Sequence, residues 1–466
     1  MNNLDKIFNP KSVAIIGASE KENSVGNGLI KNITQGGVFK NKYCKPFKGK
    51  IYPINPNHEN MMGLKCYKSI LDIKNEVDLA IIAVPAKFVT GVMNDCAKKK
   101  VSGVIVISAG FSEIGEEGKK LQDEFMEVAK KAKIPVIGPN CLGIIRTPSD
   151  LNASFAPSMP PRGNIGFISQ SGALADSIID WSIEERYGMS TIISYGNAAD
   201  IDASDLLEWL GEDKSTDAIT IYIEGLKNPL KFMEVAKKVT KKKPVIVIKG
   251  GRTEEGQKAI SSHTGSLAGS YEIYEAMFKQ SGVIVADTVE ELFDTAKALA
   301  NQPAPEENSV VIVTNGGGAG VLTADYCRSL GVNLAELKAS TIKNLDNTKK
   351  MHPAYSKRNP LDIIGDALPE RYEAAIGTVL SEDYIHGVIV LQTLQTMTDP
   401  IKDAEIIIDL HKRYPKKPVI CVYMGGKYSD AGAKLLEENG IPDYNDPKKA
   451  VKAMKSLIDR SVYLKR

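Results

Sequence analysis

Several common sequence features are missing from this chain of 466 residues, and each absence removes a class of protein. The chain has no large excess of charge of one sign, because it contains 59 Lys and Arg residues and 57 Asp and Glu residues, which give a net charge of +2. Dedicated nucleic-acid binders and membrane-surface proteins need a basic excess, so no nucleic-acid partner and no membrane partner is expected. Apolar runs are interrupted by Gly, Ser or Pro well before 18 residues, so no membrane-spanning helix is predicted.

Cysteine is scarce, and no two cysteines have zinc-finger or Cys-x-x-Cys spacing, so no metal site is predicted. Scattered free thiols are typical of a reducing compartment, and the first residues lack the apolar core of a signal peptide. We therefore expect a cytoplasmic protein. The six cysteines are Cys44, Cys66, Cys96, Cys141, Cys327 and Cys421.

Short, continuous apolar runs recur along the chain with stretches of helix length between them. Continuous runs indicate strands buried on both faces, and their alternation with helices indicates βαβ units and parallel sheets. The predicted fold class is therefore α/β with parallel sheets. The runs lie at residues 13–16, 81–84, 104–107, 135–137, 165–168, 219–223, 245–248, 310–313, 387–391 and 419–422.

The length predicts about three domains at roughly 150 residues each. Three strand–glycine loop–helix units begin at intervals that match this estimate. Residues 152–164 and 301–308 are proline-rich and polar breaks between these units, as linkers are. We predict domains at residues 1–150, 151–300 and 308–466.

Lysine clusters precede several strands, and the two explanations for them differ in function. They could form a patch for an anionic ligand, or they could end helices, where positive charge complements the helix dipole. The second explanation is favoured. The clusters lie at residues 98–100, 130–131, 241–243 and 416–417.

A loop of small residues after the first strand opens a helix, and backbone N–H groups in that setting bind phosphate. Its spacing departs from Gly-x-Gly-x-x-Gly, and the next strand ends in Asn55-Pro56, without the carboxylate usual at an NAD site. A nucleotide-like ligand other than NAD is therefore favoured, although a simple tight turn is the alternative. The loop contains Gly17, Ala18, Ser19, Ser24, Val25 and Gly26, and Ser108, Ala109 and Gly110 end a further strand.

The second third of the chain contains another such strand-to-helix turn, formed by Ser169, Gln170, Ser171 and Gly172. Its N–H groups and hydroxyls would face an anion, and an ordinary Ser N-cap is the alternative.

His263 lies in a Gly- and Ser-rich stretch, residues 261–269, that is expected to be a loop. A neutral imidazole can accept a phosphoryl group when an acceptor holds its other nitrogen, and Glu224 at a strand end could do so. A structural histidine and a solvated strand-end acid are the alternatives.

Residues 1 to about 290 resemble the α chain of succinyl-CoA synthetase, and residues from about 308 resemble the carboxyl-terminal ligase domain of its β chain. This fused order is similar to the α subunit of ADP-forming acetate–CoA ligases, which are nucleoside-diphosphate-forming acyl-CoA synthetases. Besides the first glycine-rich loop, the motifs are Gly138-Pro-Asn140-Cys-Leu-Gly143, Ser169-Gln-Ser-Gly172, Glu224-Gly225, His263-x-Gly265, Thr314-Asn315-Gly316-Gly317-Gly318-Ala319-Gly320 and Asn359-Pro-Leu-Asp362.

The resemblance implies a Rossmann-like CoA-binding domain followed by two flavodoxin-like ligase domains, each with a doubly wound parallel sheet. It implies CoA contacts at Gly17, Ala18, Ser19, Ser24, Val25, Gly26, Asn55, Pro56, Ser108, Ala109 and Gly110. It implies that phosphate and substrate meet Asn140, Ser169, Gln170, Ser171 and Gly172, and that a second helix terminus, at Asn315, Gly316, Gly317 and Gly318, stabilises phosphohistidine.

The implied reaction forms an acyl phosphate from acyl-CoA and inorganic phosphate, and His263, held by Glu224, then takes the phosphoryl group. The family passes that group to ADP on an ATP-grasp domain with Mg²⁺. No segment of the chain is left for this domain, so a separate β chain is expected, with α2β2 as the family assembly. Asp176 stands where succinyl-CoA synthetases tend to carry Tyr, which favours a monocarboxylic acid such as acetate. The alternative is a CoA-binding sensor or acetyltransferase scaffold without ligase activity.

Overall fold

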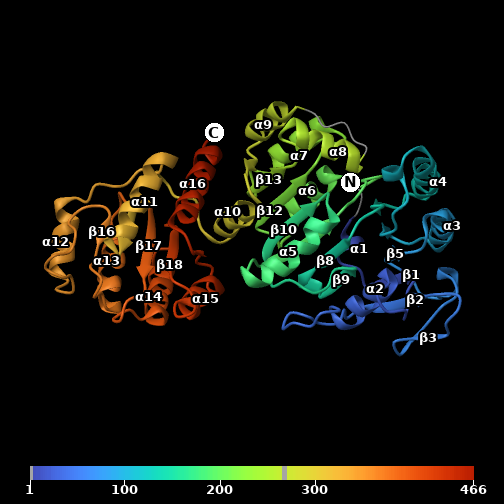
Figure 1. The fold of residues 1–466 in the computed structure, drawn as a ribbon, viewed down its shortest axis with the longest axis horizontal. Coiled ribbons are helices and arrows are strands. Elements are labelled where there is room, and N and C mark those ends of the chain that lie inside the picture. The colour runs from blue at the N-terminus through green and yellow to red at the C-terminus, as the bar shows by residue number, and fades with distance from the viewer. Residues whose placement is uncertain (1–3, 265–269) are drawn as a thin grey trace. The chain divides into compact units, whose positions relative to one another are not determined.

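The computed structural model describes residues 4–264 and 270–466, and the side chains of all these residues except 261–264. The chain divides into two compact units, Met1–Asp287 and Thr288–Arg466 (Figure 1). The first unit contains two of the three large sheets, and the second unit contains the third. The three-domain boundaries taken from the sequence stay a prediction.

The first sheet is parallel and has the strand order β2-β1-β5-β6-β7. Alternate residues of its strands enter two different cores, because Val13 and Ile15 pack on one face while Ala14 and Ile16 pack on the other. The continuous apolar runs therefore are strands buried on both faces. The elements are α1 (Asp5–Phe8), β1 (Ser12–Ile16), α2 (Val25–Gln35), β2 (Lys50–Ile54), the hairpin β3 (Asn60–Met61) and β4 (Leu64–Lys65), β5 (Leu79–Ile82), α3 (Val89–Lys99), β6 (Gly103–Val106), α4 (Glu116–Ala132) and β7 (Val136–Ile137).

The second sheet has the order β14-β13-β12-β10-β11-β8-β9, and its last two strands form an antiparallel extension. The chain passes from the first sheet to the second within residues 138–142. The elements are β8 (Gly143–Arg146), β9 (Leu151–Ser154), β10 (Arg162–Ser169), α5 (Gly172–Glu184), β11 (Met189–Ser194), α6 (Ala203–Glu212), β12 (Ala218–Ile223), α7 (Pro229–Val239), β13 (Val245–Lys249), α8 (Glu254–Thr264), α9 (Tyr271–Gln280) and β14 (Ile284–Val285).

One sequence expectation is wrong in this part of the chain. The break at residues 152–164 stays a prediction, and in the structure it spans the end of β9, residues 155–161 and the start of β10, with Asn152 and Ser154 buried in hydrogen bonds. The loop predicted around His263 is helical through Thr264, and Glu254 and Glu255 favour that helix by lying in its first turn. Residues 265–269 of that stretch lie outside the described residues.

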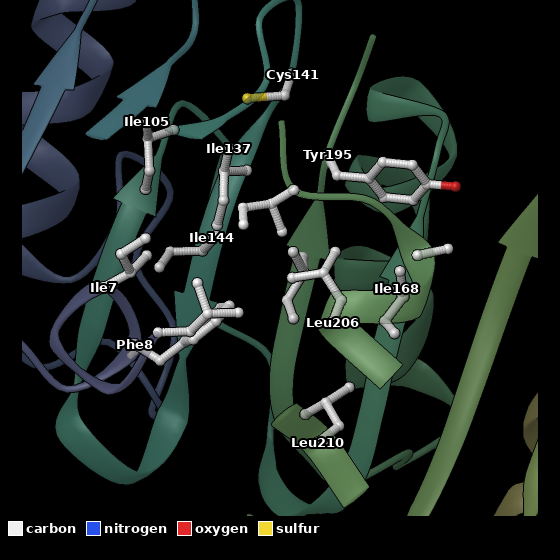
Figure 2. Close-up of a cluster of buried hydrophobic side chains, with 14 of the residues drawn as sticks. Ile7, Phe8, Ile105, Ile137, Cys141, Ile144, Ile168, Tyr195, Leu206 and Leu210 are labelled. Atoms are coloured by element: carbon white, nitrogen blue, oxygen red, sulfur yellow. The ribbon is translucent and has the colours of Figure 1, made fainter. Parts of the chain in front are cut away.

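A shared apolar core joins the two sheets of the first unit. Figure 2 shows Ile105 and Ile137 of the first sheet and Ile168 of the second in this core, together with Leu206 of α6. A seam of backbone hydrogen bonds runs beside it, since the N–H groups of residues 197, 199 and 201 donate to the carbonyls of residues 139, 138 and 136. These contacts make residues 1–287 one compact unit.

The second unit has a parallel sheet in the order β16-β15-β17-β18-β19, with α13, α14 and α15 packed over one apolar core. Helix α10 is joined to α16 by the ion pairs Lys449–Glu290 and Lys452–Glu291, the second at 2.9 Å. The elements are α10 (Val289–Asn301), β15 (Val310–Thr314), α11 (Gly317–Leu330), α12 (Ala339–Asn347), β16 (Leu361–Asp362), α13 (Pro369–Ser381), β17 (Gly387–Thr393), α14 (Pro400–Arg413), β18 (Val419–Met424), α15 (Asp430–Glu438), β19 (Asp443–Tyr444) and α16 (Pro447–Leu464).

Lysines from two of the clusters bind backbone carbonyls near helix C-termini. The Nζ of Lys243 donates to the carbonyls of residues 210 and 213 at the end of α6, and that of Lys417 donates to those of residues 380 and 382 at the end of α13. Across residues 4–264 and 270–466, no helix combines the length and the apolar character that a membrane crossing needs.

Asp403 is a buried acid in α14, and the fold makes it sensitive to pH. The Nε2 of Gln392 donates to its Oδ2 at 2.5 Å, and burial raises the pKa of Asp403 to about 7. The folded protein therefore retains a proton that the unfolded chain releases near pH 4, so folding loses stability as the pH rises from 4 towards 7 and above.

We therefore expect Asp403→Asn to raise the free energy of unfolding above pH 7 by on the order of a few kcal/mol, with the gain vanishing below pH 4. Urea unfolding at several pH values measures this difference. Asp409→Asn, at an exposed position of the same helix, is the control and should keep the wild-type pH dependence. An equal gain at pH 4 and pH 8 would contradict the assignment.

Candidate active site

A cavity of about 1280 Å³ opens in the first unit, where the carboxyl ends of strands from both sheets meet. Ligands of α/β proteins bind in the crevice outside such strand ends. The predicted site residues that line this cavity are Val25, Ser108, Ala109, Asn140, Gln170, Ser171 and Gly172.

The first glycine-rich loop packs tightly beneath the start of α2. Gly17 has φ +92°, and a Cβ there would lie 2.4 Å from the carbonyl oxygen of Ala83. A Cβ on Gly26 would lie 2.1 Å from the carbonyl oxygen of Gly17. Ser24 caps the helix by accepting from the N–H of Asn27 at 3.2 Å. The helix terminus is thereby fixed next to Val25, the residue of this loop that lines the cavity.

Asn55 and Pro56, predicted as CoA contacts, follow β2. The Asn55 Nδ2 donates to the carbonyl of Ala18 at 2.9 Å, and its Oδ1 accepts from the N–H of Asn57 at 3.0 Å. The Nδ2 of Asn27 similarly donates to the carbonyl of Ser19 at 3.2 Å. The two amides therefore hold the first loop in place, a role that the sequence pattern did not predict.

The second strand-to-helix turn has the predicted form. Ser171 is the N-cap of α5 and accepts from the N–H of Leu174 at 3.2 Å, while the buried Ser169 hydroxyl donates to the carbonyl of Ser171 at 2.6 Å. Ser171, Gly172 and Ala173 line the cavity at the positive end of the helix dipole. This end of α5 can receive an anion.

Gln170 joins this turn to the loop that carries Glu224. Its Oε1 accepts from the N–H groups of Glu224 and Gly225 at 2.9 and 3.2 Å, and Gly225 lines the cavity. Glu224 is 6% exposed, and its Oε1 accepts from the Tyr222 hydroxyl at 3.4 Å. Because the side chain of His263 lies outside the described residues, its pairing with Glu224 stays a prediction.

Lys249 is a buried residue that the sequence did not indicate, and it contacts the backbone of Glu224. Its Nζ donates to the Glu224 carbonyl at 2.8 Å and lies 4.8 Å from the ring centroid of Tyr274. Burial lowers the pKa of Lys249, and the nearby Glu224 carboxylate opposes that shift only in part.

The cavity contains Asp176, the residue that the sequence comparison with succinyl-CoA synthetases singled out. Asp176 lies one turn into α5, and burial raises the pKa of its carboxyl. The buried Oδ1 of Asp176 makes no hydrogen bond to any described residue. The other polar lining residues outside the predicted set include Glu113, Gln122, Asn197 and Lys227.

In the second unit, the loop of Asn315 and Gly316 connects β15 to α11, whose first residues are Gly317 and Gly318. Its strand has β16 on one side and β17 on the other, so the loop sits where the strand order reverses. The Asn315 side chain is used within the unit, because its Oδ1 accepts from the N–H and hydroxyl of Thr393 at 2.7 and 2.9 Å. The glycines at residues 316–318 leave the helix terminus open to a ligand.

No group of His, Cys, Asp and Glu side chains within the described part of the chain could hold a metal ion.

Three family models match successive parts of the chain: a CoA binding domain at residues 11–147, a succinyl-CoA ligase like flavodoxin domain at 162–299 and a ligase-CoA domain at 310–457. Acetate–CoA ligase [ADP-forming] I subunit alpha of Pyrococcus furiosus is 45% identical over 463 residues, which cover 97% of each chain. The chain belongs to the family of ADP-forming acetate–CoA ligases.

Two further proteins are similar to the chain, one of them longer than it and the other of known structure. Acetate–CoA ligase [ADP-forming] of Methanocaldococcus jannaschii is 46% identical, and the match covers 98% of this chain but 63% of that protein. The dinucleotide-forming acetyl-coenzyme A synthetase 1 of Candidatus Korarchaeum cryptofilum, solved with phosphate and ADP, matches with a TM-score of 0.92 and 39% identity. The match covers 100% of this chain and 99% of that one. The family resemblance and the α/β fold class expected from the sequence are confirmed.

Two glycines of α2 provide a matched test of the first loop. A methyl group on Gly26 would collide with the Gly17 carbonyl, whereas one on Gly28 would meet the Phe155 Cβ at 3.6 Å, an ordinary contact. We expect Gly26→Ala to lower the unfolding temperature and weaken CoA binding at least about tenfold. Gly28→Ala should be neutral or stabilising by up to about 1 kcal/mol, since Ala is the better helix former. Thermal unfolding and calorimetric titration with CoA measure both effects, and equal behaviour of the two variants would contradict the packing argument.

Proposed function

We propose that the chain is the α subunit of an acid–thiol ligase that converts acetyl-CoA, inorganic phosphate and ADP into acetate, CoA and ATP. One observation supports this most directly. The cavity joins the loops of the sheet matched by the CoA-binding model to the positive N-terminus of α5. A thioester carried on CoA can therefore meet phosphate in one cavity.

In the proposed first step, CoA lies along the first loop, with Val25, Ser108 and Ala109 at the cavity wall. Phosphate lies at the N-terminus of α5, beside Asn140. A phosphate oxygen attacks the thioester carbonyl carbon, the C–S bond breaks, and the thiolate of CoA leaves as acetyl phosphate forms. Positioning and the helix dipole supply the stabilisation, because this step gathers negative charge at the helix end.

In the second step, an imidazole nitrogen of His263 attacks the phosphorus of acetyl phosphate, the bond between phosphorus and the acyl oxygen breaks, and acetate leaves. Glu224 holds the other imidazole nitrogen. The helix end at residues 315–318 is proposed to stabilise the phosphorylated imidazole, whose charge of about −1.5 to −2 suits a positive helix terminus.

The transfer to ADP is assigned to a partner subunit with an ATP-grasp domain and Mg²⁺. Two observations on relatives support a partner. The Pyrococcus furiosus protein is named a subunit alpha, and the Methanocaldococcus jannaschii protein contains a further third of its length beyond this chain's match. We propose an α2β2 assembly in the cytoplasm.

The phosphohistidine step has a direct test that uses acetyl phosphate and the purified chain. We expect intact mass spectrometry to find one acid-labile phosphoryl group on the wild-type chain and none on His263→Ala. His352→Ala, a histidine in the second unit, is the control and should label like the wild type. Labelling of His263→Ala would refute the assignment. Absence of labelling in the wild type even with the partner subunit, ATP and Mg²⁺ would favour the CoA-binding sensor or scaffold.

The preferred acid is a second test. Asp176 places a carboxyl in the cavity, so a substrate with a second carboxylate meets charge repulsion, which is about 4 kcal/mol for a pair about 4 Å apart at an effective dielectric of 20. We expect the reconstituted enzyme to use acetate and not succinate. We expect Asp176→Asn to lower the ratio of kcat/KM for acetate to that for succinate at least about tenfold. Ratios of kcat/KM for the two acids at pH 8 measure it. Equal use of both acids by the wild type would refute the proposal.

A further inference from the structure

Three side chains from three different loops form a hydrogen-bonded chain along the cavity wall. Glu113 follows β6, Asn140 follows β7 and Asn197 follows β11, and all three line the cavity. The Asn197 Nδ2 donates to the Glu113 Oε2 at 2.5 Å, and the Asn140 Nδ2 donates to the Asn197 Oδ1 at 3.3 Å. Glu113 and Asn140, at the two ends of this hydrogen-bonded chain, follow strands of the first sheet, and Asn197 between them follows a strand of the second sheet.

Glu113 is held as an anion at the start of this chain. Its Oε1 accepts from the N–H groups of Gly110 and Phe111 at 2.6 and 3.1 Å. Burial alone would raise the pKa of Glu113, but the hydrogen bonds from Asn197 and from these N–H groups outweigh it and hold the pKa below its usual value. An ionised carboxylate only accepts hydrogen bonds, so the neighbouring amide must turn its NH2 group towards it.

The direction of the first bond sets the direction of the second. Because the Asn197 NH2 group faces Glu113, its carbonyl oxygen faces Asn140, and only the NH2 group of Asn140 can complete that contact. The Ser112 hydroxyl and Gln122 Oε1 also accept from the Asn197 Nδ2, at 3.2 and 3.4 Å, which agrees with this direction.

The backbone fixes the end of the chain where the ligand lies. Asn140 has φ +57°, and its N–H donates to the carbonyl of Ser108 at 2.9 Å. Its side chain is exposed to the cavity, and its NH2 group has a second hydrogen beyond the one given to Asn197. That hydrogen is available to an anionic oxygen.

We propose that Glu113 is a positioning residue that acts through Asn197 to keep the NH2 group of Asn140 turned towards the phosphate that attacks the thioester. The inference rests on the proposed function and adds a residue to it. A donor held in place before the reaction stabilises an anion without a reorganisation cost, whereas an inverted amide would present its carbonyl oxygen to the phosphate.

Glu113→Gln changes one atom and tests the direction of the chain. The new amide oxygen can still accept from Gly110 and Phe111, but its NH2 group then faces that of Asn197, so both downstream amides invert. In the holoenzyme with its partner subunit, we expect KM for phosphate to rise about tenfold or more, with KM for acetyl-CoA within about twofold of the wild type. Glu117→Gln, an exposed acid of the same helical region, is the control and should leave both constants unchanged.

The double variant Glu113→Gln with Asn197→Asp separates orientation from structural support. The carboxylate introduced at position 197 would accept from the amide introduced at position 113 with one oxygen and from Asn140 with the other. The Asn140 NH2 group thereby regains its direction. We expect KM for phosphate to return to within about threefold of the wild type, and Asn197→Asp alone to be impaired because two carboxylates then face each other.

The outcomes separate this inference from the proposed function. If Glu113→Gln keeps the wild-type KM for phosphate, the inference is overturned while the ligase activity stands. Two further results of Glu113→Gln would overturn the inference: a rise in KM for both phosphate and acetyl-CoA, or a loss of the fold. Each counts against it when the double variant does not restore the wild-type behaviour. A wild-type holoenzyme without ligase activity would refute the proposed function, and isothermal titration of the chain with inorganic phosphate still tests the inference there. The inference is supported if Glu113→Gln binds phosphate more weakly and the double variant restores the affinity. It is overturned if the affinity of Glu113→Gln for phosphate is unchanged.

Discussion

The seam between residues 136–140 and 197–201 is the contact on which the cavity depends. The N–H groups of residues 197 and 199 donate to the carbonyls of residues 139 and 138, both at 2.9 Å, and the N–H of Val136 donates to the Asp200 carboxylate at 3.0 Å. Gly196 is needed there, because a Cβ would lie 2.3 Å from two carbonyl oxygens of the neighbouring turn. The seam sets the carboxyl edge of one sheet against that of the other, and the wall of the cavity forms where they meet.

The proposed anion site consists largely of backbone and amide groups, and of the two lysines that line the cavity, Lys119 and Lys227, the second donates to the carbonyl of Ala198. The net charge of +2 is small, and Lys243 and Lys417 are bound to carbonyls at helix ends. Phosphate groups would instead meet the N-terminus of α5, which Ser171 caps, and the amide of Asn140, whose direction Asn197 sets. Rigid dipoles suit a phosphoryl group that must later leave, because they stabilise charge without a strong ion pair.

The sequence predicted the features that local pattern determines. Most of the apolar runs, the α/β class and the strand-to-helix turns at Ser171 and Gly317 are in the structure because a buried strand and a helix N-terminus each leave a mark within a few residues. The strand β11 was missed, because Ser190, Thr191 and Ser194 interrupt its apolar run and satisfy their hydroxyls inside the protein.

The side-chain partners could not be predicted, because they join loops far apart in sequence. Glu113 and Asn197 belong to no motif, and they meet only when the two sheets close. Asn55 and Asn315 stay predicted ligand contacts, and no motif indicated that their amides bind the carbonyl of Ala18 and the backbone of Thr393. An amide in a loop therefore says little about its partner until the neighbouring loop is in place.

The ion pairs between α10 and α16 have a consequence for how the chain can be cut. Helix α10 follows the second sheet directly, and the flavodoxin-like family model extends through it to residue 299. Its acids nevertheless pair with Lys449 and Lys452, and the Tyr444 hydroxyl donates to the Asp294 carbonyl at 2.6 Å. A fragment ending at residue 301 would contain α10 without the second unit, so the apolar side of that helix would be exposed to solvent. A cut after residue 287 instead leaves α10 in the second unit, where it is buried.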